Sequence, residues 1–182
     1  RWRSGTQEAL TFCEWKYTEK NYGLCAGADS DRNPNPGRCA TPNLSVAQYA
    51  DGCYLRESLG RSYWSLFDEA GIDVAALSDG TRCPLRGAFY QLMRQYLVAH
   101  YERVKEPSLN VQVVALSFRG NTALHETSSD SITVEDRWNR CLRKPEQALR
   151  TVHVESIIDR ARAAAGAEHQ PWLAYLNERY GL

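Results

Sequence analysis

A long amphipathic segment followed by a continuous apolar run is the feature that most limits how this chain can fold. Residues 84–106, PLRGAFYQLMRQYLVAHYERVKE, carry side chains at helical spacing on one face, with prolines near both ends. The residues on that face are Phe89, Leu92, Met93, Tyr96, Leu97 and His100. The next segment, LNVQVVALSF at 109–118, is apolar without a break from Val113 to Leu116, as in a strand covered on both faces. We therefore expect a helix whose apolar stripe faces a sheet.

The other expected elements surround this helix and strand. The opening segment, RWRSGTQEALTFCEWKYTE, indicates two strands joined by a tight turn at Ser4 and Gly5. Residues 21–43 are rich in Gly, Pro, Asn and Asp and indicate an irregular surface loop. Further elements are expected as a short helix at 63–70, a helix at 133–143 that begins with a capping box, a short edge strand at 151–154, and helices at 155–165 and 168–180. This order predicts an α/β fold with a mixed central sheet flanked by helices.

Length and charge bound the class of protein. A chain of 182 residues with 43% hydrophobic content fits one domain, residues 1–182, with a core of its own. The chain starts at Arg1 rather than at methionine, so we expect a processed product or a fragment that lacks the N-terminal part of the domain. The 22 basic and 22 acidic residues balance, so an anion-binding site must be a local patch. Without a signal peptide or an apolar run near the ~20 residues of a membrane span, we expect a cytoplasmic protein with no membrane partner.

The six cysteines are scattered and form no CxxC pair. In a cytoplasmic protein this pattern favours free structural thiols, so we predict six reduced cysteines that are not bound to metal. An alternative is a cysteine-bound metal or iron–sulfur centre at Cys25, Cys39 and Cys53, which follow one another at intervals of fourteen residues. Metal analysis of the purified protein separates these two readings.

The strand ALTFCEWKYTE places opposite charges two residues apart. Because side chains alternate across a strand, Glu14 and Lys16 share one face, and Cys13, Trp15 and Tyr17 share the other. If the second set faces the core, the ion pair faces an opening. A carboxylate that binds Mg²⁺ beside a lysine that stabilises charge on a phosphate is a site for phosphodiester hydrolysis. The alternative is a solvated ion pair worth about 0–1 kcal/mol.

Three segments together resemble the PD-(D/E)xK nuclease superfamily, and within it bacterial restriction-endonuclease-like proteins. They are LTFCEWKYTEKNYG, FYQLMRQYLVA and WLAYLNERYGL, in the same order along nearly the whole chain. The resemblance implies a restriction-endonuclease-like core, Mg²⁺ or Mn²⁺ as cofactor and DNA as partner. It implies that Glu14 binds the metal with the backbone carbonyl of Trp15, that Lys16 is the catalytic lysine, and that Gln91 lies near the site. For Gln91, Arg94 and Gln95 the alternative is a polar helix face.

One feature departs from the superfamily, which requires an aspartate on the preceding strand. The only acid upstream of Glu14 is Glu8, six residues away and roughly 20 Å distant along an extended strand. Either the partner acid precedes Arg1, roughly five positions upstream if the turn is at Ser4 and Gly5, or the nuclease is degenerate. The two hypotheses are a Mg²⁺-dependent DNA endonuclease in restriction or defence, and a non-catalytic nucleic-acid-binding or interaction module. A homodimer is an alternative to a monomer.

Overall fold

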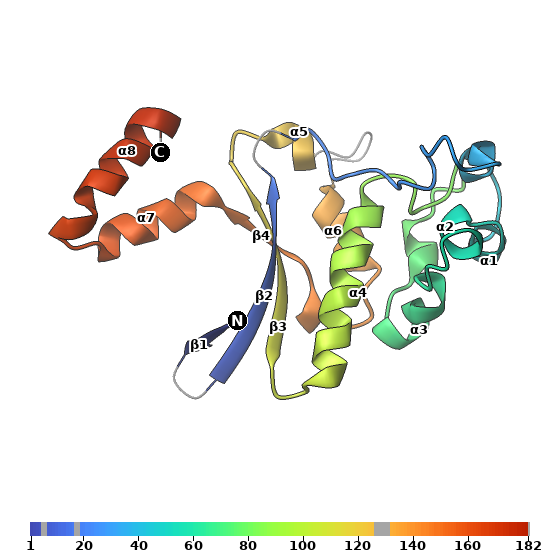
Figure 1. The fold of residues 1–182 in the computed structure, drawn as a ribbon, viewed down its shortest axis with the longest axis horizontal. Helices are drawn as coiled ribbons and strands as arrows, with labels where there is room; N and C mark the ends of the chain where they lie inside the picture. The colour runs from blue at the N-terminus through green and yellow to red at the C-terminus, as the bar shows by residue number, and fades with distance from the viewer. Residues whose placement is uncertain (5–6, 17–18, 126–131, 182) are drawn as a thin grey trace.

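A mixed four-stranded sheet lies at the centre of the described chain (Figure 1). The computed structural model describes residues 1–4, 7–16, 19–125 and 132–181. The sheet has the order β1 (Trp2–Ser4), β2 (Gln7–Lys16), β3 (Asn110–Ser117) and β4 (Arg150–His153). β1 pairs antiparallel with β2. β3 pairs parallel with β2 on one side and with β4 on the other. The α/β class and the mixed central sheet expected from the sequence are confirmed.

Helix α4 (Phe89–Lys105) covers one face of the sheet (Figure 1). Its buried side chains include Leu92, Met93, Tyr96 and Leu97, which lie in one core cluster with Val111, Val113 and Ala115 of β3. Helix α6 (Val134–Arg140) packs against α4, where the Trp138 ring meets the Tyr96 ring with centroids 5.9 Å apart. The apolar stripe predicted at 84–106 therefore does face the sheet.

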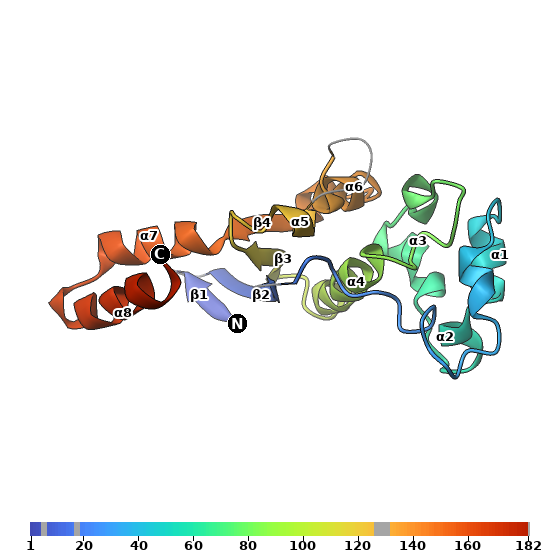
Figure 2. The same cartoon turned by 90° about the horizontal axis from the view of Figure 1, so that it is seen from above.

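Short elements form a further layer outside α4, at the end of the molecule away from the sheet (Figures 1 and 2). They are η1 (Pro36–Ala40), α1 (Val46–Asp51), α2 (Tyr54–Glu57), η2 (Trp64–Leu66), α3 (Phe67–Ala70) and η3 (Val74–Leu77). The helix predicted at 63–70 corresponds to η2 and α3, and Gly71 ends it in the left-handed conformation with φ 73°. The sequence did not predict α1 and α2, which are too short to show helical periodicity.

The last two long helices project from the opposite side of the sheet. α7 (Val154–Ala164), η5 (Ala167–His169) and α8 (Gln170–Tyr180) run side by side in both views (Figures 1 and 2). They share a small cluster of Val154, Ile158 and Leu173. The remaining elements are α5 (Thr122–His125) and η4 (Pro145–Gln147). No helix within the described ranges is both long enough and apolar enough to cross a membrane.

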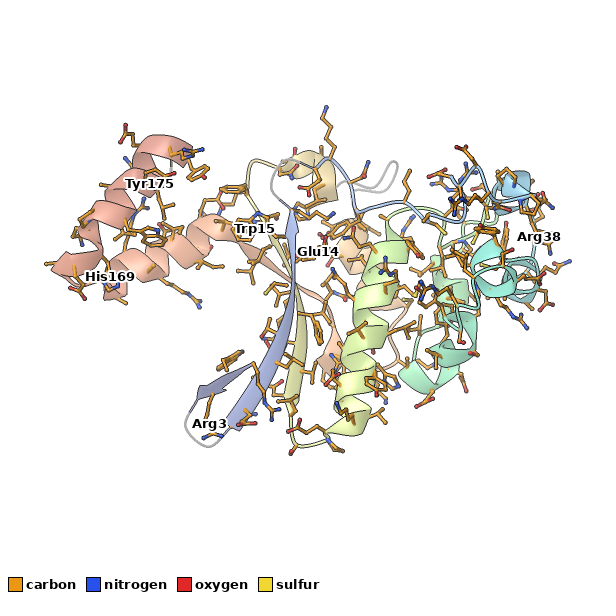
Figure 3. All side chains as sticks on the ribbon, viewed as in Figure 1. Arg3, Glu14, Trp15, Arg38, His169 and Tyr175 are labelled. Atoms are coloured by element: carbon orange, nitrogen blue, oxygen red, sulfur yellow. The ribbon has the colours of Figure 1, made fainter. Side chains whose placement is uncertain are left out.

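One prediction about the hairpin is wrong, and one condition considered for its second strand is not met. Ser4 pairs with Gln7, so it belongs to β1 rather than to the turn, and Gly5 lies outside the described residues. The set Cys13 and Trp15 does not face the core: Cys13 is exposed and Trp15 is 54% exposed. Figure 3 shows Glu14 and Trp15 on opposite sides of β2. Alternation defines two faces, but here α4 covers the charged one; Tyr17, predicted on the other face, lies outside the described residues.

Candidate active site

The charged pair lies at the carboxyl end of a parallel strand. Lys16 is the last residue of β2, and its register partners Ser117 and, one strand further, His153 are the last residues of β3 and β4. The carboxyl ends of parallel strands are where open α/β sheets place their ligands, because the loops diverge there. Polar side chains from three strands therefore meet at this edge.

Glu14 is held from two sides. The Nζ atom of Lys16 lies 3.3 Å from Glu14 Oε1. The amide nitrogens of Gln91 and Gln95 donate to Oε1 and Oε2 of the same carboxylate. Gln91 and Gln95 are four residues apart on α4, so they project from the same face of the helix. The resemblance implied that Gln91 lies near Glu14 and Lys16, and it does contact Glu14. Glu14 is one end of a fixed hydrogen-bond network.

The chain after β2 approaches Gln91 closely. The backbone N–H of Gly23 donates to Gln91 Oε1 at 2.6 Å. A Cβ atom at position 23 would lie 3.3 Å from the same oxygen, tighter than an ordinary contact. Both polar ends of the Gln91 amide are therefore engaged, one by Gly23 and one by Glu14. This fixes the orientation of the amide, because a flipped amide would present a donor to the Gly23 N–H.

Lys16 is buried, with 6% of its surface exposed. Its ammonium lies 5.5 Å from the centroid of the Tyr22 ring, in the geometry of a cation–π contact. Tyr22 is fully buried, and its hydroxyl donates to Glu135 Oε1 at 2.5 Å. Burial, then the hydrogen bond to Glu135, raise the pKa of Tyr22. The phenol therefore stays neutral and links Lys16 to a second polar network.

That second network runs from Glu135 to β3. Glu135 Oε1 also lies 2.6 Å from Nδ1 of His125, whose Nε2 lies 2.8 Å from the Ser117 hydroxyl. Burial raises the pKa of Glu135, but hydrogen bonds from His125 and Tyr22 outweigh it and hold the pKa below its usual value. Glu135 lies in the first turn of α6, where the helix dipole favours a negative charge. Ser117 is 0% exposed, so this Ser–His–Glu arrangement supports the site rather than presenting a nucleophile to a polymer.

A comparison with known protein families identifies the family of this chain. The sequence profile of the family described as "Restriction Endonuclease associating with ARP" matches residues 2–181. The chain belongs to this family. No curated protein sequence and no solved structure shows significant similarity to the chain. The mixed sheet flanked by helices is compatible with a restriction-endonuclease-like core, and the family suggests a nuclease-related or defence-related function.

An open depression lies beside Glu14 in this member of the restriction-endonuclease family. Its volume is about 490 Å³, and it is lined by Phe12, Glu14, Tyr63, Leu66, Gln91, Arg94, Gln95, Leu97, Val98 and Tyr101. Arg94 is exposed, and its guanidinium lies 5.6 Å from the centroid of the Tyr90 ring. The depression therefore combines an exposed arginine and aromatic side chains with the Glu14 carboxylate.

The donors for a divalent cation are only partly present. Within the described ranges, no three His, Cys, Asp or Glu side chains are grouped closely enough to hold a metal ion. One further oxygen is available as a ligand for a cation. Gln95 Oε1 is buried and has no hydrogen-bond partner, while the nitrogen of the same amide donates to Glu14. A neutral oxygen and a carboxylate are ligands that Mg²⁺ accepts. The side chain of Trp15 points away from these atoms.

Sequence reasoning predicted that Glu14, Lys16 and Gln91 lie close together, which they do, and it missed the residues behind them. Gln95 was weighed only as part of a polar helix face, although its spacing of four from Gln91 predicts that both reach the same neighbour. Tyr22 and Glu135 had no usable signal, because they are 113 positions apart and meet only through the fold.

Proposed function

We propose that the protein is a Mg²⁺-dependent endonuclease of the PD-(D/E)xK type that hydrolyses DNA phosphodiester bonds in restriction or defence. The observation that carries the proposal is the pairing of Glu14 and Lys16 at the carboxyl end of β2, held by two glutamines of α4. Membership of a restriction-endonuclease family supports the same reaction class. DNA as substrate, Mg²⁺ as metal and assembly as a homodimer are all parts of this proposal.

Each residue has a role set by its chemistry. The cation, bound by Glu14, the Gln95 amide oxygen and the Trp15 carbonyl, would lower the pKa of a water molecule and polarise the phosphate. Lys16 offers a positive charge beside that carboxylate, where it stabilises the negative charge that develops on the phosphate oxygens. Gln91, anchored by Gly23, keeps the Glu14 carboxylate in place. Arg94 at the depression offers a contact for the DNA backbone.

A second carboxylate would complete the site. The antiparallel register pairs Trp2 with Ala9 and Ser4 with Gln7. Continued beyond Arg1, this register sets the fourth position upstream of Arg1 opposite Glu14, and we propose an acid near there if the natural chain extends that far. This differs from the roughly five positions expected from the sequence, because Ser4 pairs with Gln7 instead of lying in the turn.

A second candidate is a non-catalytic nucleic-acid-binding or interaction module on the same fold. The observation in its favour is that both carboxylate oxygens of Glu14 already accept amide hydrogens, with Lys16 beside them. A carboxylate so engaged needs no metal to be stable. In this candidate the network is structural, and the protein would bind DNA without cutting it.

The test is cleavage of supercoiled plasmid DNA with Mg²⁺ or Mn²⁺, using the chain with any residues that its gene encodes upstream of Arg1. Nicking or linearisation that falls at least 100-fold in Glu14→Gln and in Lys16→Met supports the endonuclease. Glu8→Gln is the matched control on the same strand, because Glu8 binds only the nearby Arg1 and Arg3 among its described ion pairs. Cleavage that survives Glu14→Gln and Lys16→Met would overturn the assignment. Binding of DNA without cleavage by the unaltered protein would favour the second candidate.

A further inference from the structure

Four of the six cysteines converge on one small pocket in the layer outside α4. Cys25 lies in the loop after β2, Cys39 lies in η1, Cys53 precedes α2, and Cys83 lies shortly before α4. All four line the same pocket of about 20 Å³. That volume is on the scale that a single water or ion needs, about 10–15 Å³. Four chain segments far apart in sequence therefore bring their thiols to a space of ionic size.

Backbone hydrogen bonds tie the segments together. The N–H of Cys83 donates to the carbonyl of Cys39 at 3.0 Å. The N–H of Cys25 donates to the carbonyl of Arg86 at 3.0 Å, and the N–H of Arg86 returns to the carbonyl of Cys83 at 3.0 Å. Three of the four cysteine segments are thus joined through their main chains beside the pocket. Their meeting does not depend on exposed, independent loops.

Two of the sulfur atoms receive backbone N–H groups, as a thiolate ligand requires. Backbone N–H groups of Ala28 and Gly27 lie at the sulfur of Cys25. The backbone N–H of Leu85 lies at the sulfur of Cys83. Outside the pocket, Cys141 behaves as an ordinary thiol, because its Sγ donates to the carbonyl of Trp138 at 2.8 Å. N–H donors directed at sulfur stabilise the anion that binds metal.

Positive charge lies beside the same pocket. Arg38 and Arg86 both line it. The Nε atom of Arg38 is buried and has no hydrogen-bond partner. Four thiolates around a divalent ion carry a net charge of minus two, which two guanidinium groups offset. Figure 3 shows Arg38 at the end of the molecule remote from Glu14. The pocket adjoins the depression of the candidate active site, since Tyr63 lines both, but Glu14 and the two glutamines do not line it.

We propose that Cys25, Cys39, Cys53 and Cys83 bind one Zn²⁺ ion as a structural tetrathiolate site. Within the described residues the side chains are not yet grouped closely enough to hold an ion, so the thiols would turn toward the pocket centre as the metal binds. Binding displaces the four thiol protons. The ion would join short elements between residues 36 and 77 to the start of α4, a region with little regular structure to hold it. This proposal replaces the sequence prediction of six metal-free thiols, and it adds Cys83 to the three cysteines weighed there.

Metal analysis of the purified full chain, expressed in medium with zinc and never exposed to chelator, tests the site. We expect about one zinc per chain in the unaltered protein and less than a tenth of that in Cys25→Ser and Cys83→Ser. Cys13→Ser and Cys141→Ala are matched controls, because Cys13 is exposed on β2 and Cys141 binds Trp138; both should retain the zinc. Absence of zinc from the unaltered protein would overturn the proposal, and iron in its place would overturn the choice of ion.

A second measurement covers variants that fail to fold. The unaltered protein, stripped of metal and titrated with Co²⁺, should develop the intense sulfur-to-cobalt absorption of a tetrathiolate site, saturating at one equivalent. Added Zn²⁺ should displace the cobalt and remove this absorption. In protein that still holds its metal, a thiol reagent should react quickly with Cys13 and slowly with Cys141 and the four pocket cysteines. A titration with no such absorption would count against the site, whatever the variants do.

Discussion

Replacing the two charges of the Glu14–Lys16 pair, singly and together, tests whether the pair is buried as one unit. Lys16 is 6% exposed and faces Glu14 Oε1 at 3.3 Å. Glu14 has the amides of Gln91 and Gln95 as further donors, and 20% of its side chain is exposed. Removing Glu14 should therefore lower the unfolding free energy more than removing Lys16, because the Lys16 ammonium has fewer other partners than the Glu14 carboxylate.

The expected magnitudes follow from that asymmetry. Removing one partner of a buried ion pair costs about 3–5 kcal/mol of unfolding free energy, because the other charge stays uncompensated. Glu14→Gln should lie near the lower end, about 3 kcal/mol, since the Tyr22 ring still faces the ammonium. Lys16→Met should cost about 1–2 kcal/mol, because two amides still satisfy the carboxylate. The double variant removes both buried charges and should lie within about 1 kcal/mol of the unaltered protein.

Urea unfolding followed by circular dichroism measures the four free energies, with Glu8→Gln as the half-buried control on the same strand. Single costs of about 3 and about 1–2 kcal/mol with a double variant near zero give a coupling energy of about 4–5 kcal/mol between the two positions, above the usual range for contacting residues. Single costs that simply add, or a Glu14→Gln variant as stable as the unaltered protein, would refute the buried-unit reasoning. The same proteins assayed on plasmid DNA separate stability from function, because the double variant should be stable and inactive.

Two further predictions concern the network behind Lys16. Tyr22→Phe removes the hydroxyl that donates to Glu135, so the buried carboxylate loses a donor; unfolding free energy should fall by about 1–3 kcal/mol, and an unchanged urea midpoint would contradict the hydrogen bond. Glu135→Gln should flatten the acid side of the stability profile. The pKa of Glu135 is lowered in the folded protein, so its contribution is full above the unfolded pKa of about 4.3 and is lost as pH falls through the lowered value. The melting temperatures of the unaltered protein and of Glu135→Gln should therefore converge as the pH falls from 6 to 3. Melting profiles that stay parallel over this range would show that Glu135 does not contribute in this way.

Local patterns allowed the sheet and its covering helix to be predicted. The stripe of α4 and the unbroken apolar run of β3 are short-range signals, and each fixes an element and the face that it buries. The same holds for the start of α6, where the Thr133 hydroxyl accepts from the Asp136 N–H at 3.0 Å as the capping pattern predicted. Alternation along β2 likewise predicted that Glu14 and Lys16 lie together.

Residues whose roles depend on distant segments could not be predicted in this way. Alternation did not show which face of β2 is covered, because that depends on a tyrosine ring and two glutamines from segments outside β2, which surround the Glu14–Lys16 pair. A strand with an exposed tryptophan and a buried lysine inverts the usual pattern, in which lysine is almost never fully buried unless paired. The pocket of four cysteines has the same origin, since sequence spacing alone gave no close pair.

The inversion on β2 bears on which candidate function is correct. A buried ion pair is a weak source of stability, because desolvation offsets its Coulomb attraction, and a well-packed apolar pair of similar volume would serve a purely structural role as well. Here the chain retains a buried ammonium and surrounds it with Glu14, Tyr22 and, through Tyr22, the Glu135 network. Local rules are broken most often where a site needs the chemistry that breaks them. That the pair lies at the carboxyl ends of the strands, beside an open depression, therefore favours the endonuclease over the non-catalytic module.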